Sequence, residues 1–477
     1  MLFNSKYSKI FFLSFFFILW AAINSKAYDI LYFYTEKNNF TYLINFLRSI
    51  GPSIIFFAFL ILILKKKFFS KIIFIKNIVL FYFILFILIQ IIGFYLNPKN
   101  YIDLYEYKSV FLIIKNDEFL TNIFLLYDQN YYLINLLSVI FFFFLLNNLK
   151  EKKYYKFLFI INIAILILVN IPIGVLSYKE YLLSNNFTAY WNKMTSPESM
   201  ILNQSVPRVT GLSRSLIIIY IYIMCCTFFK KNIFDNKLFF IFLLVLGSLI
   251  WSFQSRTAVY SLFLFNLLII SLSKIEIKKK ILTILVLCIG PIIIHNLIFY
   301  TNINLKKFNA NTNNPNINNV EQNQNTISLN KFTAENRVVL VDTTGRIEIW
   351  KNIIEQARTA TIFGKGSQAD RWYLDRIDKW KNNASSSLFY SLICGGLLGV
   401  ITYVLIIYET IKLLLSCILK LKFFRKKNDN LYYSAFFILI FLLLRSIVEN
   451  SFMIFSIDNL IFLTCFFLLK TNSKINQ

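Results

Sequence analysis

The sequence predicts an all-α polytopic integral membrane protein with about 12 transmembrane helices and one large, partly helical loop on the outer side. Of its 477 residues 57% are hydrophobic, and these stand in long runs such as 54–64, 78–92 and 238–246. Runs this continuous leave no alternating polar face for water and approach the length of a bilayer crossing. They argue against a soluble enzyme and against a DNA-binding domain, although the formal net charge is +26. We expect the lipid bilayer, and no nucleic acid, as a partner.

Twelve apolar segments are long enough to cross a bilayer, for which about 17–25 residues are needed. They are 10–25, 49–64, 77–96, 131–148, 155–176, 213–229, 238–254, 257–273, 281–299, 388–408, 432–448 and 451–469. The first follows Lys6 and Lys9 and is also compatible with a signal peptide, whose removal would leave the sidedness of the rest unchanged.

The charges between these segments alternate from loop to loop. Lysine clusters at 65–76, 150–156, 230–237, 274–280 and 420–427 fall in every second loop. The loop at 97–130, in contrast, has more acidic than basic residues. By the positive-inside rule, both termini and the lysine clusters are cytoplasmic, and the long loops lie on the outer side.

This topology divides the chain into four regions. Residues 1–176 hold the first five transmembrane helices, 177–299 hold a first large outer loop and helices six to nine, 300–387 form the large outer loop, and 388–477 hold helices ten to twelve. In the large loop, Ile347, Trp350, Ile354 and Ala357 fall on one helical stripe. The stripe predicts a helix that either lies on the membrane surface or packs as an ordinary loop helix, with a turn at 363–366 after it.

Metal and disulfide chemistry are not predicted. The six cysteines lie within or at the ends of apolar runs, without the spacing of metal ligands, and His295 is the only histidine. We expect His295, near the outer end of its span, to be a buried interior imidazole rather than a catalytic base. We expect no metal and no cofactor.

Arginine is distributed against the positive-inside gradient. Of the eleven arginines, only Arg425 is expected in the cytoplasm, and Arg445 lies in a span. The other nine fall on the outer side, namely Arg48, Arg208, Arg214, Arg256, Arg337, Arg346, Arg358, Arg371 and Arg376. Because a guanidinium stays charged and binds phosphate or carboxylate bidentately, this predicts an outer site for a diphosphate head group or an anionic glycan. For Arg371 and Arg376, surface pairing with neighbouring aspartates such as Asp370 is the favoured interpretation.

The other charges near the membrane differ in what they indicate. Arg445 and Glu449 are four residues apart near the outer end of a span, where they can neutralise each other. Asp458, early in the last span, is a candidate for the same interior. Arg256 lies in a tight outer hairpin, where a cation needs a nearby anion, so we expect a functional role for it.

Five segments, in this order, resemble motifs of the O-antigen ligase and O-antigen polymerase family of bacterial envelope glycosyltransferases. They are 207–214 (PRVTGLSR), 254–256 (QSR), 344–350 (TGRIEIW), 363–366 (FGKG) and 385–399 (SSSLFYSLICGGLLG). The resemblance covers roughly residues 205–400, and it includes the common outer sidedness of the motifs and the large loop between the ninth and tenth spans. The glycines of the last segment would allow close helix approach.

The resemblance implies a metal-independent membrane glycosyltransferase at the periplasmic face of the bacterial inner membrane. The donor would be a glycan on undecaprenyl diphosphate, and the acceptor would be a sugar hydroxyl of a glycan or of a lipid A-core. The catalytic candidates, whose guanidinium groups would stabilise the leaving diphosphate, are Arg256, Arg208, Arg346 and Arg214. The substrate-binding candidates are Ser385, Ser386, Glu348 and Gly211.

Two points stay open within this resemblance. Ligases of the family typically carry a His-Asn-Ser-like segment where this chain has ASSS at 384–387, which favours polymerase over ligase without deciding between them. A base for the acceptor hydroxyl is also undecided, and the candidates are Glu180, Glu198, Asp342 and Glu348.

Two other functions compete with glycan transfer. A lipid-linked oligosaccharide flippase or other transporter would also fit twelve spans. Transporters built from repeats usually have corresponding halves, however, and this chain has no recognisable internal repeat and an off-centre large loop. A catalytically inactive family member is the other alternative, because the histidine is missing.

Overall fold

The structure, a computed structural model, describes residues 77–97, 140, 143, 146–147, 152–183, 209–229, 237–253, 255–273, 275–313, 346–366, 369–372, 384, 386–419, 430–449 and 457–473. Its helices are α4 (Ile78–Leu96), α8 (Lys152–Leu183), α11 (Val209–Phe228), α12 (Lys237–Ser252), α13 (Arg256–Leu272), α14 (Ile277–Asn313), α16 (Arg346–Arg358), α17 (Ala369–Trp372), α18 (Ser387–Leu419), α20 (Asn430–Val448) and α21 (Ile457–Ser473). Within these ranges the only β feature is an isolated bridge between Thr361 and Gly364. The predicted all-α class is therefore confirmed for the described part of the chain.

Four helical segments in this part of the chain are long and apolar enough to cross a membrane. They are Ile78–Leu96, Ile277–Ile298, Ser387–Leu419 and Asn430–Val448. Three shorter apolar helices cover Leu212–Phe228, Leu238–Ser252 and Thr257–Leu272. These helices are those of a membrane protein. The expected spans 10–25 and 49–64, and nearly all of 131–148, lie outside the described residues.

Several helices extend beyond the expected spans, among them α8, which ends at Leu183 rather than near 176. Helix α14 continues to Asn313, although its apolar segment was expected to end near 299. Helix α18 continues to Leu419, although its segment was expected to end near 408. The length of an apolar run predicts how much of a helix lies in lipid, not where the helix ends. A helix can therefore continue beyond the end of its apolar run.

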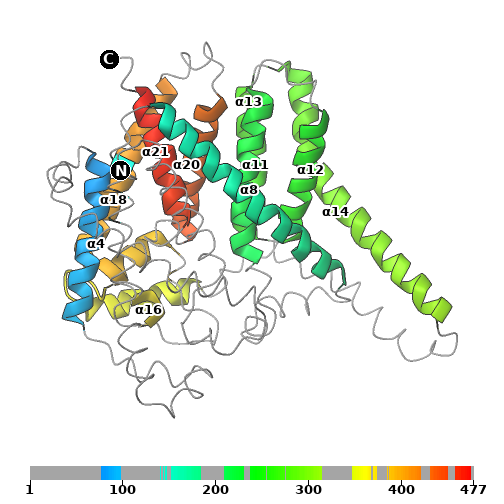
Figure 1. Cartoon of the computed structure of the whole chain (residues 1–477). Coiled ribbons are helices and arrows are strands. Elements are labelled where there is room, and N and C mark those ends of the chain that lie inside the picture. Colours follow the sequence, from blue (N-terminus) through cyan, green and yellow to red (C-terminus); the bar gives the residue numbers. More distant parts are fainter. Residues whose placement is uncertain are drawn as a thin grey trace, which may run out of the picture. The chain divides into compact units, whose positions relative to one another are not determined.

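The helices form two compact units (Figure 1). The first contains α4, α16, α17, α18 and α21, with the start of α8 and the end of α20. The second contains α11 to α14, with the rest of α8 and α20. The boundary falls after Asn162 in α8 and after Ile438 in α20, so each of these helices contributes to both units.

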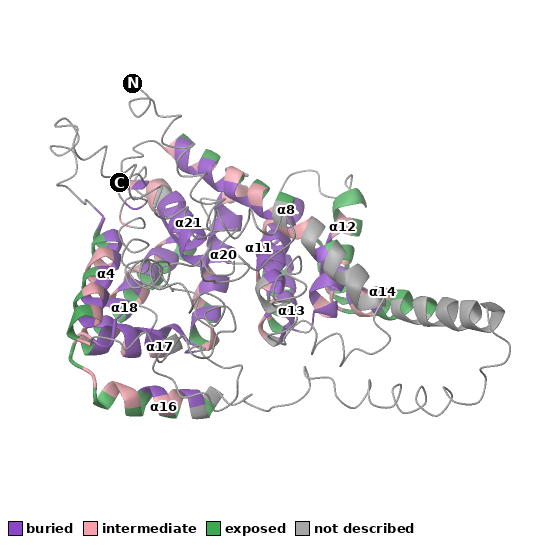
Figure 2. Cartoon of the chain, turned by 60° about the horizontal axis from the view of Figure 1, so that its bottom comes forward, coloured by how far each residue is buried: buried purple, intermediate pink, exposed green. Residues whose placement is uncertain are grey.

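Helix α18 is the centre of the first unit, because α4, α16, α17 and α21 all pack against it (Figure 1). Phe83 of α4 contacts Phe143 and Phe462, with ring centroids 5.6 and 6.0 Å away. Lys470 of α21 donates a hydrogen bond to Asn77, the residue before α4, at 3.0 Å. Buried residues are concentrated on α21, whereas α4, α16 and α18 each keep an exposed side (Figure 2).

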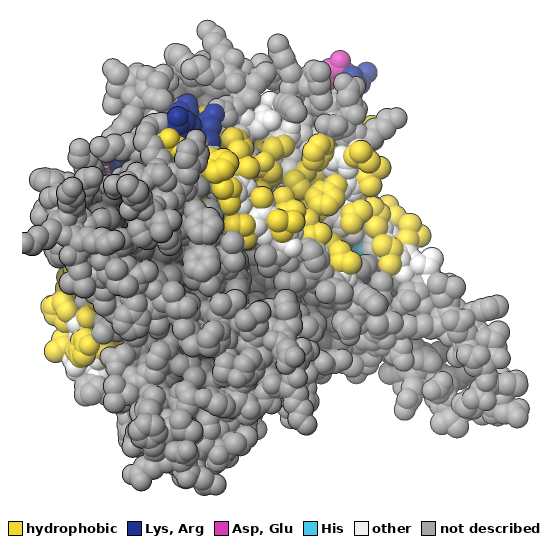
Figure 3. Space-filling view, viewed as in Figure 1, with side chains coloured by type: hydrophobic (Ala, Val, Ile, Leu, Met, Phe, Trp, Pro, Cys, Tyr) yellow, Lys and Arg dark blue, Asp and Glu magenta, His cyan; other side chains and the backbone are white. Residues whose placement is uncertain are grey.

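The second unit packs α12 against α11 and α14, and α13 against α11, α12 and α14. Gly247 of α12 faces Pro291 of α14, and a Cβ added at the glycine would lie 2.8 Å from the proline ring. The apolar side chains that α14 leaves exposed include Ile281, Leu285 and Ile289. Figure 3 shows hydrophobic side chains over a broad face of the described surface. An apolar surface of this extent indicates contact with lipid.

Candidate functional site

Helix α18 is broken at Gly396, inside the expected re-entry into the membrane. This residue has φ 60° and ψ −154°, and a residue with a side chain rarely adopts a φ in that range. Gly395 and Gly399 face Phe86 of α4, as the predicted close helix approach requires, whereas Gly396 interrupts the helix instead. The interruption frees backbone groups that an intact helix would pair internally, and buried groups of this kind need other partners.

The turn at 361–366 supplies those partners from its own backbone. The N–H of Lys365 donates to the carbonyl oxygen of Ile393 at 2.8 Å, and the next residue of each segment repeats the contact at 3.0 Å. In the opposite direction, the N–H of Leu398 donates to the carbonyl oxygen of Ile362 at 3.3 Å. A Cβ at Gly364 would overlap the backbone of α18. The predicted turn is confirmed, and it completes the hydrogen bonding of the broken helix.

The end of α4 encloses the same turn from the other side. Asn97 donates through Nδ2 to the carbonyl oxygens of Gly93 and Gly364, at 2.9 and 3.0 Å. A Cβ added at Gly93 would lie 2.5 Å from the carbonyl oxygen of Phe363, so glycine is needed where helix and turn meet. Sequence reasoning missed this contact, because the N-terminal half was expected to contribute spans alone.

The side chain of Lys365 is buried, although the turn belongs to the loop expected on the outer side. Its Nζ donates to Oε1 of Gln356 on α16 at 2.7 Å, and the residue is only 7% exposed. Burial lowers the pKa of Lys365 below its ordinary value. Lys365 therefore connects α16 to the turn, and the turn in this position pairs with the backbone at the break in α18.

Trp350 of α16 connects the large loop to the start of α18. Its indole Nε1 donates to the carbonyl oxygen of Ala384 at 3.1 Å, and its ring stacks on Phe389 with centroids 4.9 Å apart. The N–H of Ala384 donates in turn to Oδ2 of Asp370 at 3.2 Å. Asp370 is buried rather than at the surface, and the side chains of Arg371 and Arg376, its expected partners, lie outside the described part.

The apolar stripe expected on α16 is one of two apolar faces of this helix. Ile349 and Ile353 are buried in the packing of α16 on α18, whereas Ile347 and Ile354 are exposed. With 100° between successive residues, these two pairs fall on different sides of the helix. Helix α16 therefore has two apolar faces, one of which packs as a loop helix while the other stays exposed.

Three predicted site residues belong to the first unit. Ser386 is buried one residue before α18. Arg346 begins α16 and Glu348 lies in its first turn, but their side chains are outside the described part. The Trp350 contact with Ala384 brings the helix that carries Arg346 and Glu348 to the segment before Ser386. Ser385 and Arg208 lie outside the described residues.

The other predicted site residues belong to the second unit. Gly211 and Arg214 lie in the first two turns of α11, and Arg256 is the first residue of α13. Tyr220 of α11 donates to Oδ1 of Asn266 of α13 at 2.8 Å, so these helices are in register there. Arg214 precedes Tyr220 in α11, and Arg256 precedes Asn266 in α13.

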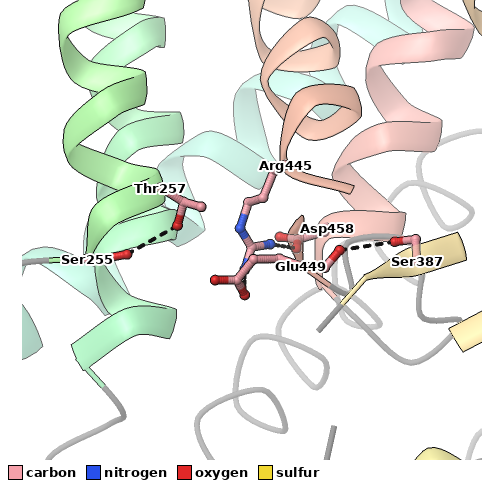
Figure 4. A network of polar contacts seen from close by, with 6 residues as sticks. All are labelled: Ser255, Thr257, Ser387, Arg445, Glu449 and Asp458. Carbon is pink, nitrogen blue, oxygen red and sulfur yellow. Dashed lines mark hydrogen bonds and ion pairs between the residues drawn. The ribbon is translucent and has the colours of Figure 1, made fainter. Parts of the chain in front are cut away.

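The hairpin before α13 is held by its own hydroxyl groups. Ser255 is buried, and its Oγ lies 3.3 Å from Oγ1 of Thr257 (Figure 4). Arg256 stands between these two residues at the start of the helix, and its side chain is outside the described part.

His295 of α14 is buried, as the sequence predicted.

An ion network joins α20 and α21 in the first unit. Arg445 donates through Nη2 to Oε2 of Glu449 at 3.0 Å and through Nη1 to Oδ2 of Asp458 (Figure 4). The predicted pair of Arg445 and Glu449 is confirmed, and Asp458 joins it. The hydroxyl of Ser387 donates to the carbonyl oxygen of Glu449 at 3.2 Å, which links the network to the start of α18.

Neither a metal site nor a similar known protein adds to this description. Among the described residues, no group of three His, Cys, Asp or Glu side chains is arranged to hold a metal ion. No family model, no curated protein and no solved structure matches the chain. The function therefore rests on the residues of this chain and on their geometry.

Proposed function

We propose that the protein transfers a glycan from undecaprenyl diphosphate to the hydroxyl of an acceptor sugar at the periplasmic face of the bacterial inner membrane. It would act as an O-antigen or surface-polysaccharide polymerase, or as an O-antigen ligase with a lipid A-core acceptor. The proposal includes twelve spans with both termini in the cytoplasm, since the lysine clusters alternate with the long loops.

One observation carries the proposal. Three of the segments that resemble the family, 344–350, 363–366 and 385–399, are in direct contact in the first unit through their described residues. The Trp350 ring stacks on Phe389 with ring centroids 4.9 Å apart, and the backbone of the turn bonds the broken part of α18. Non-helical backbone in a membrane protein occurs where it is buried in protein or lines a cavity. The contact supports a common role for these segments.

In the proposed reaction, the acceptor oxygen forms a bond to the anomeric carbon of the donor glycan. The bond from that carbon to the phosphate oxygen breaks, and undecaprenyl diphosphate leaves with the electron pair. Guanidinium groups fixed before the reaction stabilise this charge more strongly in the transition state than in the ground state. We assign this role to Arg208, Arg214, Arg256 and Arg346.

A lipid-linked oligosaccharide flippase is the second candidate function. The break in α18 favours it, because transporters commonly use discontinuous helices at their substrate sites. A flippase would move the lipid-linked glycan across the bilayer and form no glycosidic bond.

Reconstitution distinguishes these functions. The purified protein is placed in liposomes with undecaprenyl-diphosphate-linked repeat units and a lipid A-core acceptor, and glycan length is read on a gel. We expect longer glycans from the wild type, a strong loss for Arg256→Lys and wild-type product for Arg358→Lys, which changes an exposed arginine at the end of α16. Translocation of the glycan without bond formation would support the flippase and overturn the proposal.

Deletion of the gene separates the two transferase classes. Loss of long polymer with one repeat unit retained indicates a polymerase. Accumulation of full-length polymer on its lipid carrier indicates a ligase. An unchanged surface glycan would be the result for a catalytically inactive family member.

A further inference from the structure

The guanidinium of Arg445 is bound by two carboxylates, those of Glu449 and Asp458. All three residues belong to apolar helices or their ends, where ionised groups are costly and are usually retained for function. Neutralising Arg445 requires a single carboxylate. A second carboxylate on the same guanidinium is therefore more than the charge of Arg445 itself requires.

The two carboxylates of the network differ in their surroundings. The side chain of Asp458 is 0% exposed and that of Arg445 is 6% exposed, so this pair is enclosed by the protein. The side chain of Glu449 is 26% exposed, while its Oε2 stays 3.0 Å from Nη2 of Arg445. Asp458 thus serves as the buried counter-ion, and Glu449 is the carboxylate that another molecule can reach.

The backbone of Glu449 fixes where this carboxylate stands. Its carbonyl oxygen accepts the hydrogen bond of the Ser387 hydroxyl at 3.2 Å, at the first residue of α18. The preceding residue is Ser386, and Ala384 nearby accepts the hydrogen bond of Trp350. Glu449 is therefore beside the segments on which the proposed function rests, held from one side by Arg445 and from the other by Ser387 (Figure 4).

We propose that Glu449 accepts the proton of the acceptor sugar hydroxyl during glycosyl transfer, an inference that rests on the proposed function. The acceptor oxygen forms its bond to the anomeric carbon as its proton passes to an oxygen of the Glu449 carboxylate. Undecaprenyl diphosphate leaves with the electron pair of the broken bond, and the carboxyl later releases the proton to water. Arg445 is a positioning residue, which orients the carboxylate, and Asp458 holds Arg445.

Replacement of Glu449 by glutamine tests this role without removing the counter-ion of Arg445, since Asp458 remains. In the liposome assay we expect Glu449→Gln to lower kcat by about 10²- to 10⁴-fold with little change in KM, the usual contribution of a positioned proton acceptor. Glu409→Gln is the matched control. It removes a carboxylate from α18 that is 21% exposed and paired with Lys412, and it should keep wild-type activity.

Formate supplies the readout that a structural role would not give. We expect formate to restore part of the activity of Glu449→Ala, because it brings a carboxylate into the vacated space, and to leave Glu409→Ala unchanged. A Glu449→Ala variant that melts at the wild-type temperature, has low activity and does not respond to formate would overturn the inference. Wild-type kcat in Glu449→Gln would overturn it as well.

The wild-type arm separates this inference from the proposed function. If the wild type forms no glycosidic bond from the lipid-linked donor, the proposed function fails and the role of Glu449 fails with it. If the wild type is active and Glu449→Gln is equally active, only the role of Glu449 is lost.

Discussion

The side-chain amide of Asn266 in α13 donates a hydrogen bond to the carbonyl oxygen of Leu287 in α14 at 3.2 Å. In an intact helix this carbonyl would accept from the backbone N–H of residue 291, but that residue is Pro291 and has no N–H. Asn266 is fully buried, and its Oδ1 accepts the hydroxyl of Tyr220 at 2.8 Å. One side chain therefore repairs α14 and joins it to α11 and α13.

Asn266→Ala should lower the stability of the protein because it leaves the Leu287 carbonyl without its donor. We expect a loss of about 1 kcal/mol, the usual size for a hydrogen bond between membrane helices. The loss should shrink in a Pro291→Ala background, where residue 291 regains its N–H. Thermal unfolding in detergent measures both, with the exposed Asn296→Ala in the same helix as the control. Equal losses in the two backgrounds would contradict the repair.

Gly396→Ala should prevent the turn at 361–366 from docking in α18. The new Cβ would need a φ near 60° and would overlap the backbone at Ile362 and Gly364, which together predict a loss of about 3 kcal/mol. Gly174→Ala in α8 is the matched control, since a Cβ there meets Leu216 at an ordinary 3.8 Å. Limited proteolysis within 361–366 reports the docking directly, and protection equal to wild type would contradict the role of Gly396.

Lys365 should make the stability depend on pH above neutrality. Burial lowers its pKa, so between the folded and unfolded pKa values the unfolded chain binds more protons than the folded chain. Stability therefore rises with pH across that window. Between pH 7 and pH 10, the melting temperature of the wild type should rise relative to that of Lys365→Met, whose side chain at position 365 does not titrate. Lys351→Met, at an exposed position of α16, should run parallel to the wild type.

Asp458→Asn should destabilise the protein more than Glu449→Gln. Asp458 is fully buried beside Arg445, and removing a buried counter-ion costs about 3–5 kcal/mol. Glu449 is partly exposed, and loss of its charge should cost no more than about 1 kcal/mol. Denaturation of the two purified variants compares these values. Equal destabilisation would mean that Glu449 is a second structural counter-ion.

Local patterns predicted much of the first unit correctly. The expected span 77–96 agrees with α4 at Ile78–Leu96, because Asn77 caps the start of the helix and the apolar run stops at Asn97. The pair of Arg445 and Glu449 followed from helical spacing alone. Both features depend on residues within a few positions of each other, where the sequence pattern is most informative.

Long-range backbone contacts were not predictable in the same way. The glycines of α18 were visible in the sequence. The turn at 361–366, however, lies on another segment and pairs with the backbone around Gly396 through its own backbone groups. Backbone groups have no sequence signature, so this pairing could not be predicted. For the same reason Gly93 was expected to be an ordinary span residue and Asn97 an ordinary loop residue. On α16, spacing identified an amphipathic helix, but which of its two apolar faces packs depends on α18.

The break in α18 also bears on how the protein enters the membrane during synthesis. Until the turn at 361–366 is in place, the carbonyl groups of Ile393 and Cys394 lack the donors that they have in the folded protein. Both the turn and α4 precede α18 in the chain, so they leave the ribosome first. The partners of the broken helix are therefore already made when it reaches the bilayer, and an order of segments that placed α18 earlier would expose its polar backbone to lipid.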